Sequence, residues 1–548
     1  MTKGNRVLAS LPLLFHRFIP QEAEAWLGGK AHPAPLGNVA KQKDDGTWKH
    51  RLIQYLRMNG VNSASYLTER QVLPRGLDHA VDLARLQDRA GVAEEVWTLV
   101  LDLKDAFMSL PLAEGEQRFN CAHAGFEVRR DRDPLYHDEP HSGHFVVWRV
   151  LGFGGKPNPL VFARAASFAA RSAQALLGPW QEQDRADAQA CRRLAPGRLQ
   201  MYVDDPVLSC LGAEKECKLS FDLVILWWML LGIPLSWKKG SIYPQNVEHR
   251  WIGIDYTLVD TGARMRLPPD FVAELLILLL PLRSASGFMK TTELDIIVGK
   301  SARVAFVVPS AKPFVAALWG ALAGANKARA AGVKEAPPGH LPCRRFSHAA
   351  AWISALLEEK ESCPLPLERI VRARPPARAS TSGWRAEFDA SIYGGGGVLR
   401  SPDGIVRRHF VTLWNNDLAA HLQVVTGDPK HQTFWEFLTL LIVLILWGDD
   451  FVEVSLAVLG DNTGSLSSAL RLQGRGAMLA VAREVSWRTT RRRWAFEVGH
   501  LPTEHNTIAD ALSRVADPSP KSWPATALAS SEADKVPDLS KIWLARPS

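Results

Sequence analysis

LQMYVDDPVL, residues 199–208, places two adjacent aspartates, Asp204 and Asp205, inside an apolar segment that is typical of a buried strand. Burying one ionised carboxylate costs free energy and two neighbouring carboxylates repel each other, so a bound cation is one reason to keep such a pair. The alternative is a hairpin turn in which both side chains face water, because aspartate is a common turn residue. Taken alone, the stretch favours the turn.

A second stretch, VLDLKDAFMSLPL at residues 100–112, changes that balance because Asp102 follows another apolar run. A strand that ends in Asp102, placed beside a strand or hairpin that carries Asp204 and Asp205, would gather three carboxylates. Clustered carboxylates need a divalent ion, and hard oxygen ligands select Mg²⁺ or Mn²⁺. Two such ions can clamp the attacking and leaving oxygens of phosphoryl transfer. A metal site therefore becomes the better interpretation than two unrelated acidic turns.

The composition is that of a globular chain with several domains. Its 548 residues suffice for roughly three or four domains, and its net charge of +8 suits a polyanionic partner. The six cysteines form no CxxC pair, which favours a reducing compartment; we expect a protein of the cytoplasm or nucleus that is not secreted. The apolar runs 223–235 and 437–448 are shorter than the roughly 18 to 20 residues of a membrane span, so we expect core helices and no membrane partner.

The C-terminal third carries a second set of separated acids. Asp389 ends a strand before a glycine-rich turn, Glu436 lies near the start of an apolar helix, Asp461 ends another strand, and Asp510 lies near the start of a last helix. Each could instead be an ordinary helix cap, and for Asp461 the cap is an equally good interpretation.

The first set of motifs resembles the palm of a retroelement reverse transcriptase. VLDLKDAF is followed about a hundred residues later by YVDD, and LGFGGKPNPLVF (151–162) between them resembles the segment that seats template and incoming nucleotide. LGIPLSWKKG (231–240) and RWIG (250–253) resemble the nucleotide-side lysine motif and the primer grip. Upstream, the basic hairpin that begins at KQKDDGTWKHRLI (41–53) resembles the fingers hairpin. The order of five motifs carries this resemblance.

The resemblance implies that Asp102, Asp204 and Asp205 are catalytic and bind two Mg²⁺ or Mn²⁺ ions. It assigns contacts with nucleotide or primer to Lys43, Arg51, Asp105, Phe107, Phe153, Lys239, Trp251 and Gly253.

Several of these assignments carry an alternative or a specific role. Lys41 could take the place of Lys43, and Lys239 is preferred to Lys238 as the lysine that protonates the leaving pyrophosphate. Taken singly, each lysine is better interpreted as a solvated surface charge. A bulky ring at Phe107 would exclude a 2′-hydroxyl, which implies deoxynucleotide substrates.

The C-terminal acids resemble those of ribonuclease H in its retroelement form, whose final motif is matched by NTIADALSR at 506–514. By this resemblance Asp389, Glu436, Asp461 and Asp510 are catalytic and bind two Mg²⁺ ions, and His500 assists proton transfer or product release. The run WRTTRRRWAF (487–496) is a candidate contact with the backbone of an RNA/DNA hybrid, or equally a solvated edge strand.

The chain departs from the retroviral pattern in places. Phe153 stands where retroviral enzymes carry Gln, and in this position the chain resembles DIRS-like retroelements. Pro206 directly follows the paired aspartates. The segments 121–140 and 178–198 look like insertions.

The expected fold class is an α+β right-hand polymerase, with fingers, palm and helical thumb, followed by an α/β ribonuclease H-like domain. In chain order, the expected parts are an N-terminal extension (1–35), fingers and palm (36–262), a helical thumb or connection with a linker (263–375), the ribonuclease H-like domain (376–515) and a loosely ordered tail (516–548).

The expected function is RNA-directed DNA synthesis with cleavage of the copied RNA strand. The implied partners are an RNA template, a DNA or RNA primer, an RNA/DNA hybrid and deoxynucleoside triphosphates. One alternative is a catalytically inactive, retroelement-derived scaffold that binds nucleic acid, and the seven intact acids argue against it. An RNA-dependent RNA polymerase is disfavoured by Phe107 and by the ribonuclease H-like segment.

Overall fold

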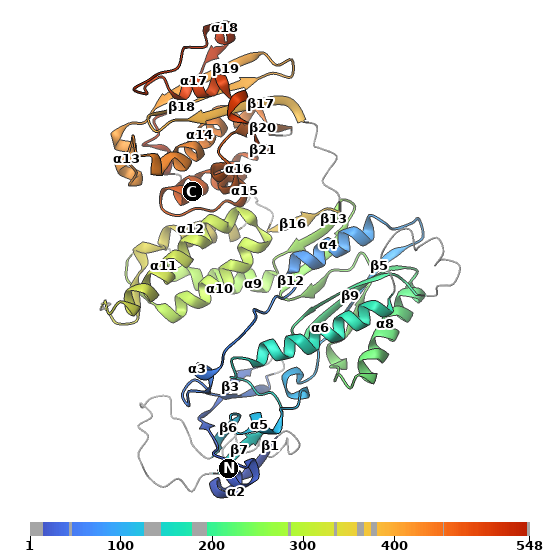
Figure 1. Cartoon of the computed structure of the whole chain (residues 1–548). Helices are drawn as coiled ribbons and strands as arrows, with labels where there is room; N and C mark the ends of the chain where they lie inside the picture. Colours follow the sequence, from blue (N-terminus) through green and yellow to red (C-terminus); the bar gives the residue numbers. More distant parts are fainter. Residues whose placement is uncertain are drawn as a thin grey trace. The chain divides into compact units, whose positions relative to one another are not determined.

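The computed structural model describes residues 15–42, 46–124, 144–177, 194–282, 286–333, 337–358, 367–373, 381–452 and 454–544. The chain divides into two compact units, Met1–Arg264 (unit 1) and Met265–Ser548 (unit 2). Both units mix helices and strands (Figure 1). The finer division into five parts stays a prediction.

The central sheet of unit 1 has the strand order β10-β5-β9-β8, and all neighbouring strands are antiparallel. The strands are β5 (Glu95–Val100), β8 (Gly197–Tyr202), β9 (Asp205–Gly212) and β10 (Ser241–Tyr243). After its first residue, every position of β9 is buried. Burial on both faces explains why the sequence that follows the paired aspartates is almost continuously apolar.

Helices cover both faces of this sheet (Figure 1). Helices α6 (Asn158–Leu176) and α8 (Glu214–Leu230) share one core cluster with Leu208 and Cys210 of β9. Helix α4 (Gly76–Gln87) also contacts β9. Successive strand residues point to opposite faces of the sheet. The residues of β9 that alternate with Leu208 and Cys210 therefore face α4.

The predicted basic hairpin is confirmed: β3 (Leu36–Gln42) and β4 (Trp48–Gln54) are antiparallel, with Gln42 opposite Trp48. A separate small sheet has the order β1-β7-β6-β2. The remaining elements of this region are β1 (Phe15–Phe18), α2 (Pro20–Leu27), β2 (Pro33–Ala34), α3 (Val61–Ala64), η1 (Ala106–Ser109), α5 (Glu114–Gln117), β6 (Cys121–Ala124) and β7 (His144–Trp148).

Each of the two predicted insertions contains strand residues at one end, while their status as insertions stays a prediction. Cys121–Ala124 forms β6 and pairs with β7, and Gly197 and Arg198 already belong to β8. Short polar-bordered strands of this kind gain their stability from partners distant in sequence, which local patterns do not reveal. The segments 125–143 and 178–193 lie outside the described residues.

Near the end of unit 1, β11 (His249–Trp251) and β12 (Ile254–Val259) form a further hairpin. Its two-residue turn is Ile252-Gly253, and both residues have positive φ, at 44° and 73°. Such a turn needs positive φ at both central positions, which glycine adopts freely and a β-branched residue does not. Strand β13 (Gly262–Arg266) spans the boundary between the units.

Unit 2 begins with a group of helices, as predicted for residues 268–330. These are α9 (Pro269–Leu279), α10 (Thr291–Val307), α11 (Lys312–Ala330) and α12 (Ser347–Leu357), with β14 (Phe288–Lys290) paired to β15 (His340–Pro342). Phe314 of α11 stacks on Trp352 of α12 at 3.6 Å between ring centroids. The predicted linker is partly structured, because Glu368–Val371 forms strand β16.

The second part of unit 2 is a six-stranded mixed sheet of order β21-β20-β17-β18-β19-β22 (Figure 1). The strands are β17 (Thr381–Ala390), β18 (Gly394–Arg400), β19 (Val406–Leu413), β20 (Ser455–Gly460), β21 (Phe496–His500) and β22 (Glu532–Ala533). Strands β17, β18 and β19 are antiparallel, whereas β20 runs parallel to both β17 and β21. The helices are α13 (Asn416–Leu422), α14 (Gln432–Trp447), α15 (Thr463–Arg471), α16 (Ala477–Arg492), α17 (Thr507–Ser513) and α18 (Ala525–Leu528).

Helix α14 is the centre of the unit 2 core. From Phe434 to Leu444 every residue is buried, and its apolar side chains join those of β17, β20 and α16 in one cluster. By length and composition the helical segment Pro429–Asp450 could cross a membrane, but most of it is buried inside the fold, as in the core helix of a soluble protein. The predicted core role of the run 437–448 is confirmed.

Glycines in β18 allow helices to approach both faces of the sheet. A Cβ at Gly396 would clash with Leu512 of α17, and one at Gly395 would lie 2.7 Å from Thr439 of α14. We predicted a glycine-rich turn at this position, whereas Gly394–Arg400 is a strand. Because these glycines have no side chain, α17, which carries Asp510, can pack directly against the sheet.

The prediction of a loosely ordered tail is wrong for residues 516–544. Strand β22 pairs with β19, and Asp534 forms two hydrogen bonds with Arg408, at 2.9 and 2.7 Å. Trp447 also donates to Asp534, at 2.8 Å, and Leu539 is buried in the core cluster. The Ser, Pro and Ala content suggested disorder, but a few anchoring residues are enough to hold the segment.

Candidate active sites

In unit 1 the paired aspartates lie at the tip of the β8–β9 hairpin. Tyr202 and Asp205 are the last pair of the ladder, so Val203 and Asp204 form a two-residue turn. Val203 has a φ of 56°, which is rare for a β-branched residue and costs backbone strain. Both original interpretations therefore hold: the aspartates occupy a hairpin turn, and they also belong to a carboxylate group.

Asp102 meets this hairpin through a continuation of the β5–β9 ladder. Beyond the last paired residues of these strands, the Leu103 backbone N–H donates to the Asp204 carbonyl at 2.9 Å. This register places Asp102 beside Asp205. The predicted meeting of Asp102 with the paired aspartates is confirmed.

The electrostatics of this group are those of crowded carboxylates. Burial and, after it, the charges of Asp204 and Asp102 together raise the pKa of Asp205 to about 6, while Lys239 opposes the shift. The Lys239 ammonium donates to Asp102 Oδ2 at 2.7 Å. The predicted lysine thus lies at the carboxylates as a counter-charge.

Aromatic rings adjoin this site on one side. The ring centroid of Phe107 lies 5.6 Å from that of Phe153 and 5.0 Å from that of Phe162. The Arg51 guanidinium, from β4, lies 5.8 Å from the Phe153 ring centroid, a cation–π distance. Asp105, with a φ of 48°, precedes the 3₁₀ turn that carries Phe107. The structure thus brings Phe107, Phe153 and Arg51 together, and Asp105 lies two residues before Phe107 in the chain.

Lys43 lies outside the described residues, and Lys41 is the last residue but one of β3. Trp251 is 2% exposed, and its indole Nε1–H donates to the Asp205 carbonyl at 2.9 Å. Burial makes this ring a support of the aspartate hairpin rather than a surface for a primer. Gly253 occupies the turn of the next hairpin.

In unit 2, Asp389, Glu436 and Asp461 form a group whose ligand atoms all lie within 4.8 Å of one another. The parallel register of β17 and β20 pairs Glu387 with Leu459, so the acids two positions further along both strands lie side by side. Glu436 projects from the first half of α14. This is the one such group of three among the described residues, and the three unit 1 aspartates are less tightly grouped.

Burial dominates the electrostatics of this group. Burial, with smaller contributions from the charges of Asp461 and Asp510, raises the pKa of Asp389 to about 7 against the opposing effect of a hydrogen bond from Ser513 Oγ (2.5 Å). Burial, followed by the charges of Asp389 and Asp461, raises the pKa of Glu436 well above its ordinary value.

The donor set fits a hard divalent cation. Glu436 Oε1 accepts from Gln432 at 3.2 Å, whereas its buried Oε2 has no hydrogen-bond partner among the described residues. An unpaired buried carboxylate oxygen beside two further carboxylates is costly without a cation. Mg²⁺ and Mn²⁺ are the ions that such oxygen ligands suit.

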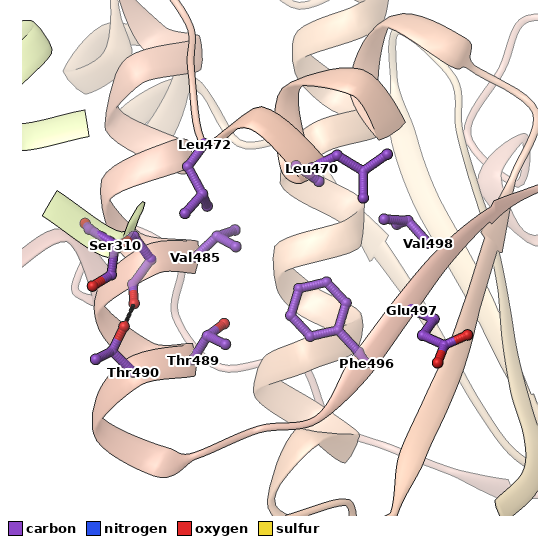
Figure 2. A pocket seen from close by; sticks show the side chains of 11 residues that line it. Ser310, Leu470, Leu472, Val485, Thr489, Thr490, Phe496, Glu497 and Val498 are labelled. Carbon is purple, nitrogen blue, oxygen red and sulfur yellow. Dashed lines mark hydrogen bonds between the residues drawn. The ribbon is translucent and has the colours of Figure 1, made fainter. Parts of the chain in front are cut away.

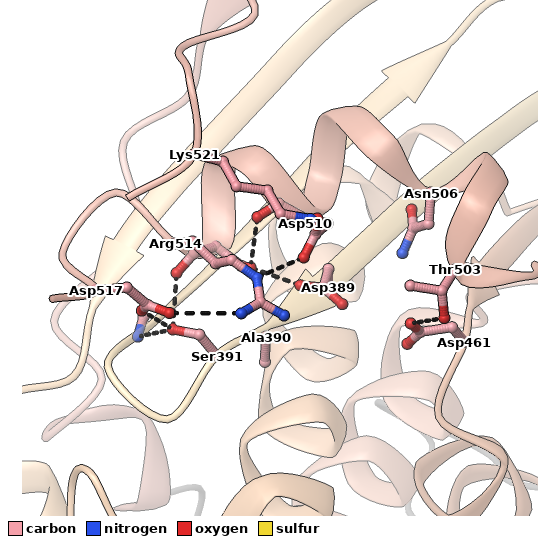
Figure 3. Close-up of polar contacts among 12 residues, drawn as sticks. Asp389, Ala390, Ser391, Asp461, Thr503, Asn506, Asp510, Arg514, Asp517 and Lys521 are labelled. Atoms are coloured by element: carbon pink, nitrogen blue, oxygen red, sulfur yellow. Dashed lines mark hydrogen bonds and ion pairs between the residues drawn. The ribbon is translucent and has the colours of Figure 1, made fainter. Parts of the chain in front are cut away.

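Asp510 is not a member of the group of three. It is paired with the cations of Arg514 and Lys521 (Figure 3). Arg514 Nε donates to its Oδ1 at 2.6 Å, and the Lys521 ammonium forms an ion pair with its Oδ2. Although burial opposes them, these two cations lower the pKa of Asp510. Lys521 and Arg514 were missed as site residues: Arg514 stood in the quoted motif, but nothing in the local pattern singled out Lys521.

Polar residues around the group hold its elements together. Thr503 Oγ1 donates to Asp461 Oδ2 at 2.8 Å (Figure 3). Asn506 Nδ2 donates to the Phe388 carbonyl at 2.9 Å. His500, the last residue of β21, is exposed and pairs in register with Gly460, directly before Asp461. The predicted His500 is thus placed next to one carboxylate.

The basic run 487–496 lies mostly on helix α16, so its interpretation as an edge strand is wrong; β21 begins only at Phe496. Arg488 is paired with Glu484, and Arg492 with Asp449. Contact with a hybrid backbone stays a prediction.

A separate cavity of about 520 Å³ lies between α15, α16 and β21 (Figure 2). Its lining is largely apolar and includes Leu472, Val485 and Phe496. It shares no residue with the carboxylate group.

No protein-family model and no curated protein matches this chain. Among solved structures it is similar to a foamy viral protease-reverse transcriptase, solved in complex with double-stranded DNA, with a TM-score of 0.41 and 14% sequence identity. The match covers 86% of this chain and 65% of that protein. A likeness of this degree assigns neither a family nor an activity.

Proposed function

We propose that the chain is an RNA-directed DNA polymerase that also cleaves the RNA strand of the hybrid it makes. The observation that carries the proposal is the pair of separate carboxylate groups, one in each unit. Asp102 and Asp205 meet in unit 1, and Asp389, Glu436 and Asp461 meet in unit 2. Two sites for divalent ions in one basic chain suit two phosphoryl-transfer reactions on nucleic acid.

In unit 1, Asp102, Asp204 and Asp205 would hold the metal ions. When bound, the ions would stabilise the attacking primer hydroxyl and the leaving pyrophosphate. Arg51 would bind the triphosphate of a deoxynucleotide, and the Phe107 ring would exclude a 2′-hydroxyl. Lys239, already at Asp102, is near enough to the carboxylates to give a proton to the leaving group.

In unit 2, Asp389, Glu436, Asp461 and Asp510 would hold the ions that activate water against an RNA phosphodiester. Thr503 orients the Asp461 carboxylate, and Ser513 orients that of Asp389. The exposed ring of His500, beside Asp461, is available for proton transfer or product release. The proposed descent from a DIRS-like element rests on Phe153. The cation–π contact between Arg51 and the Phe153 ring gives an aromatic residue a role at this position.

The test is primer extension by the full chain on an RNA template with deoxynucleotides and Mg²⁺ or Mn²⁺. We expect synthesis by the wild type, loss of synthesis in Asp204→Asn, and full synthesis in Asp222→Asn, which changes an exposed acid on α8. If the folded wild type extends no primer, and if the wild type and Asp204→Asn bind primer-template equally well, the chain is instead a nucleic-acid scaffold.

A further inference from the structure

The segment that follows α17, residues 515–524 (the strap), is fastened at two points to the unit 2 carboxylate site. Ser391 Oγ, just beyond β17, donates to Asp517 at 2.6 Å, and the Asp517 backbone N–H donates to the Arg514 carbonyl at 3.1 Å. Four residues further on, Lys521 reaches the Asp510 carboxylate (Figure 3). Lys521 therefore ties the strap to Asp510, the one predicted metal ligand of unit 2 outside the group of three.

Both oxygens of Asp510 are occupied by cations. Arg514 takes Oδ1 from the same helix, one turn away, and Lys521 takes Oδ2 from the strap. The Asp510 side chain is only 5% exposed, so it needs a counter-charge at all times. A divalent ion can use Oδ2 only when the Lys521 ammonium leaves it.

Lys521 is the cation that is free to leave. Its side chain is 52% exposed, so the ammonium can return to water at little cost, and lysine holds its partner as a point charge on a flexible stem. A cavity of about 770 Å³ beside it, lined among others by Thr507, Ser522 and Pro524, gives room for that movement.

We propose that Lys521 is a built-in counter-cation that holds Asp510 until a divalent ion displaces it, and that this exchange releases the strap. The proposal rests on the proposed ribonuclease H site and makes Lys521 a positioning residue of that site. It links metal occupancy to strap mobility, because the same ammonium cannot pair with Asp510 while the ion does. Removing the lysine should favour metal by removing its competitor.

The experiment measures hydrogen exchange of strap amides in the full chain as Mg²⁺ is added. In the wild type we expect exchange within residues 515–524 to rise as Mg²⁺ saturates the site, and in Glu436→Gln we expect no rise. In Lys521→Gln the strap should exchange fast without Mg²⁺. Mg²⁺ should also slow amide exchange at Asp461 and its neighbours. In Lys521→Gln this protection should be half-maximal at an about tenfold lower Mg²⁺ concentration than in the wild type, which is within the usual range of coupling between two ligands. Lys521→Arg should restore wild-type behaviour, and Lys535→Gln, which changes another exposed lysine of the C-terminal segment, should match the wild type.

Strap exchange that ignores Mg²⁺, or a half-saturation in Lys521→Gln within twofold of the wild type, would overturn the proposal. Thermal unfolding of each variant without Mg²⁺ checks that the fold is kept. If wild type cleaves hybrid RNA and the strap does not respond, the counter-cation role fails alone. If the strap responds as expected and no RNA is cleaved, the ribonuclease function fails and the counter-cation role stands.

Discussion

Replacing Asp389 by Asn should stabilise unit 2 in the absence of metal. Asp389 is 4% exposed and faces the carboxylates of Glu436 and Asp461, so its charge is costly unless a cation is bound. The amide keeps an oxygen that can accept the Ser513 hydrogen bond, and it carries no charge. The substitution would therefore remove a destabilising term while the local packing is kept.

The magnitude follows from the pKa. Burial and neighbouring charges raise the pKa of Asp389 to about 7 from an ordinary value of 3.8. The folded state binds this proton more tightly than the unfolded state, so stability falls as the pH rises from about 4 to about 7 and is constant above that range. At about 1.4 kcal/mol for each tenfold difference in proton affinity, the destabilisation above pH 7 is at most about 4 kcal/mol. Because Glu436 shares the effect, we expect a gain of about 2 to 4 kcal/mol in the variant.

The assay is hydrogen exchange of the α14 amides against urea in EDTA, which reports the unfolding free energy of unit 2 without requiring the whole chain to unfold in one step. The gain should be full at pH 8 and less than half as large at pH 5. Mg²⁺ should stabilise the wild type and not Asp389→Asn, and Asp417→Asn, an exposed acid of α13, should show neither effect. A wild type that is as stable as the variant at pH 8 in EDTA would refute this reasoning.

Three further predictions concern unit 1. Phe107→Ala should raise incorporation of ribonucleotides relative to deoxynucleotides by at least tenfold, because the ring would no longer exclude a 2′-hydroxyl; competitive primer extension measures the ratio, and an unchanged ratio counts against this role. Trp251→Phe should remove the hydrogen bond to the Asp205 carbonyl and destabilise unit 1 by about 1 to 3 kcal/mol; exchange of the β9 amides reports this, and a change below about 0.5 kcal/mol would contradict it. Because the pKa of Asp205 is raised to about 6, Mg²⁺-dependent synthesis should fall as the pH drops through 6, since the protonated carboxyl is a poor ligand. A rate that stays level down to pH 5 at limiting Mg²⁺ would contradict this last prediction.

The sequence predicted the carboxylate groups well because strand ends carry a local signal. An apolar run that ends in an acid marks where a buried strand meets the surface, and the ladders then bring Asp102 to Asp205 and Asp389 to Asp461. Glu436 could be predicted as a site residue because it is an acid in an apolar helix that must be buried.

Other features depend on contacts that local patterns do not contain. Glycines 394–397 suggested a turn because glycine is frequent in turns, yet they are strand residues against which α14 and α17 pack. The strap and Lys521 lie in a Ser- and Pro-rich segment whose order comes from Ser391 and Asp510, more than a hundred residues and eleven residues away. The burial of Trp251 likewise depends on the aspartate hairpin that its indole contacts.

The central claim is that one chain holds two independent metal-dependent sites, and one reaction tests it most directly. The full chain is given a labelled RNA template, a DNA primer, deoxynucleotides and Mg²⁺, and extended primer and cleaved RNA are measured together for the wild type, Asp205→Asn and Glu436→Gln. We predict both products from the wild type, RNA cleavage of a preformed hybrid without synthesis from Asp205→Asn, and synthesis without cleavage from Glu436→Gln. Loss of both products in either folded variant, or of neither product in both, would contradict the claim.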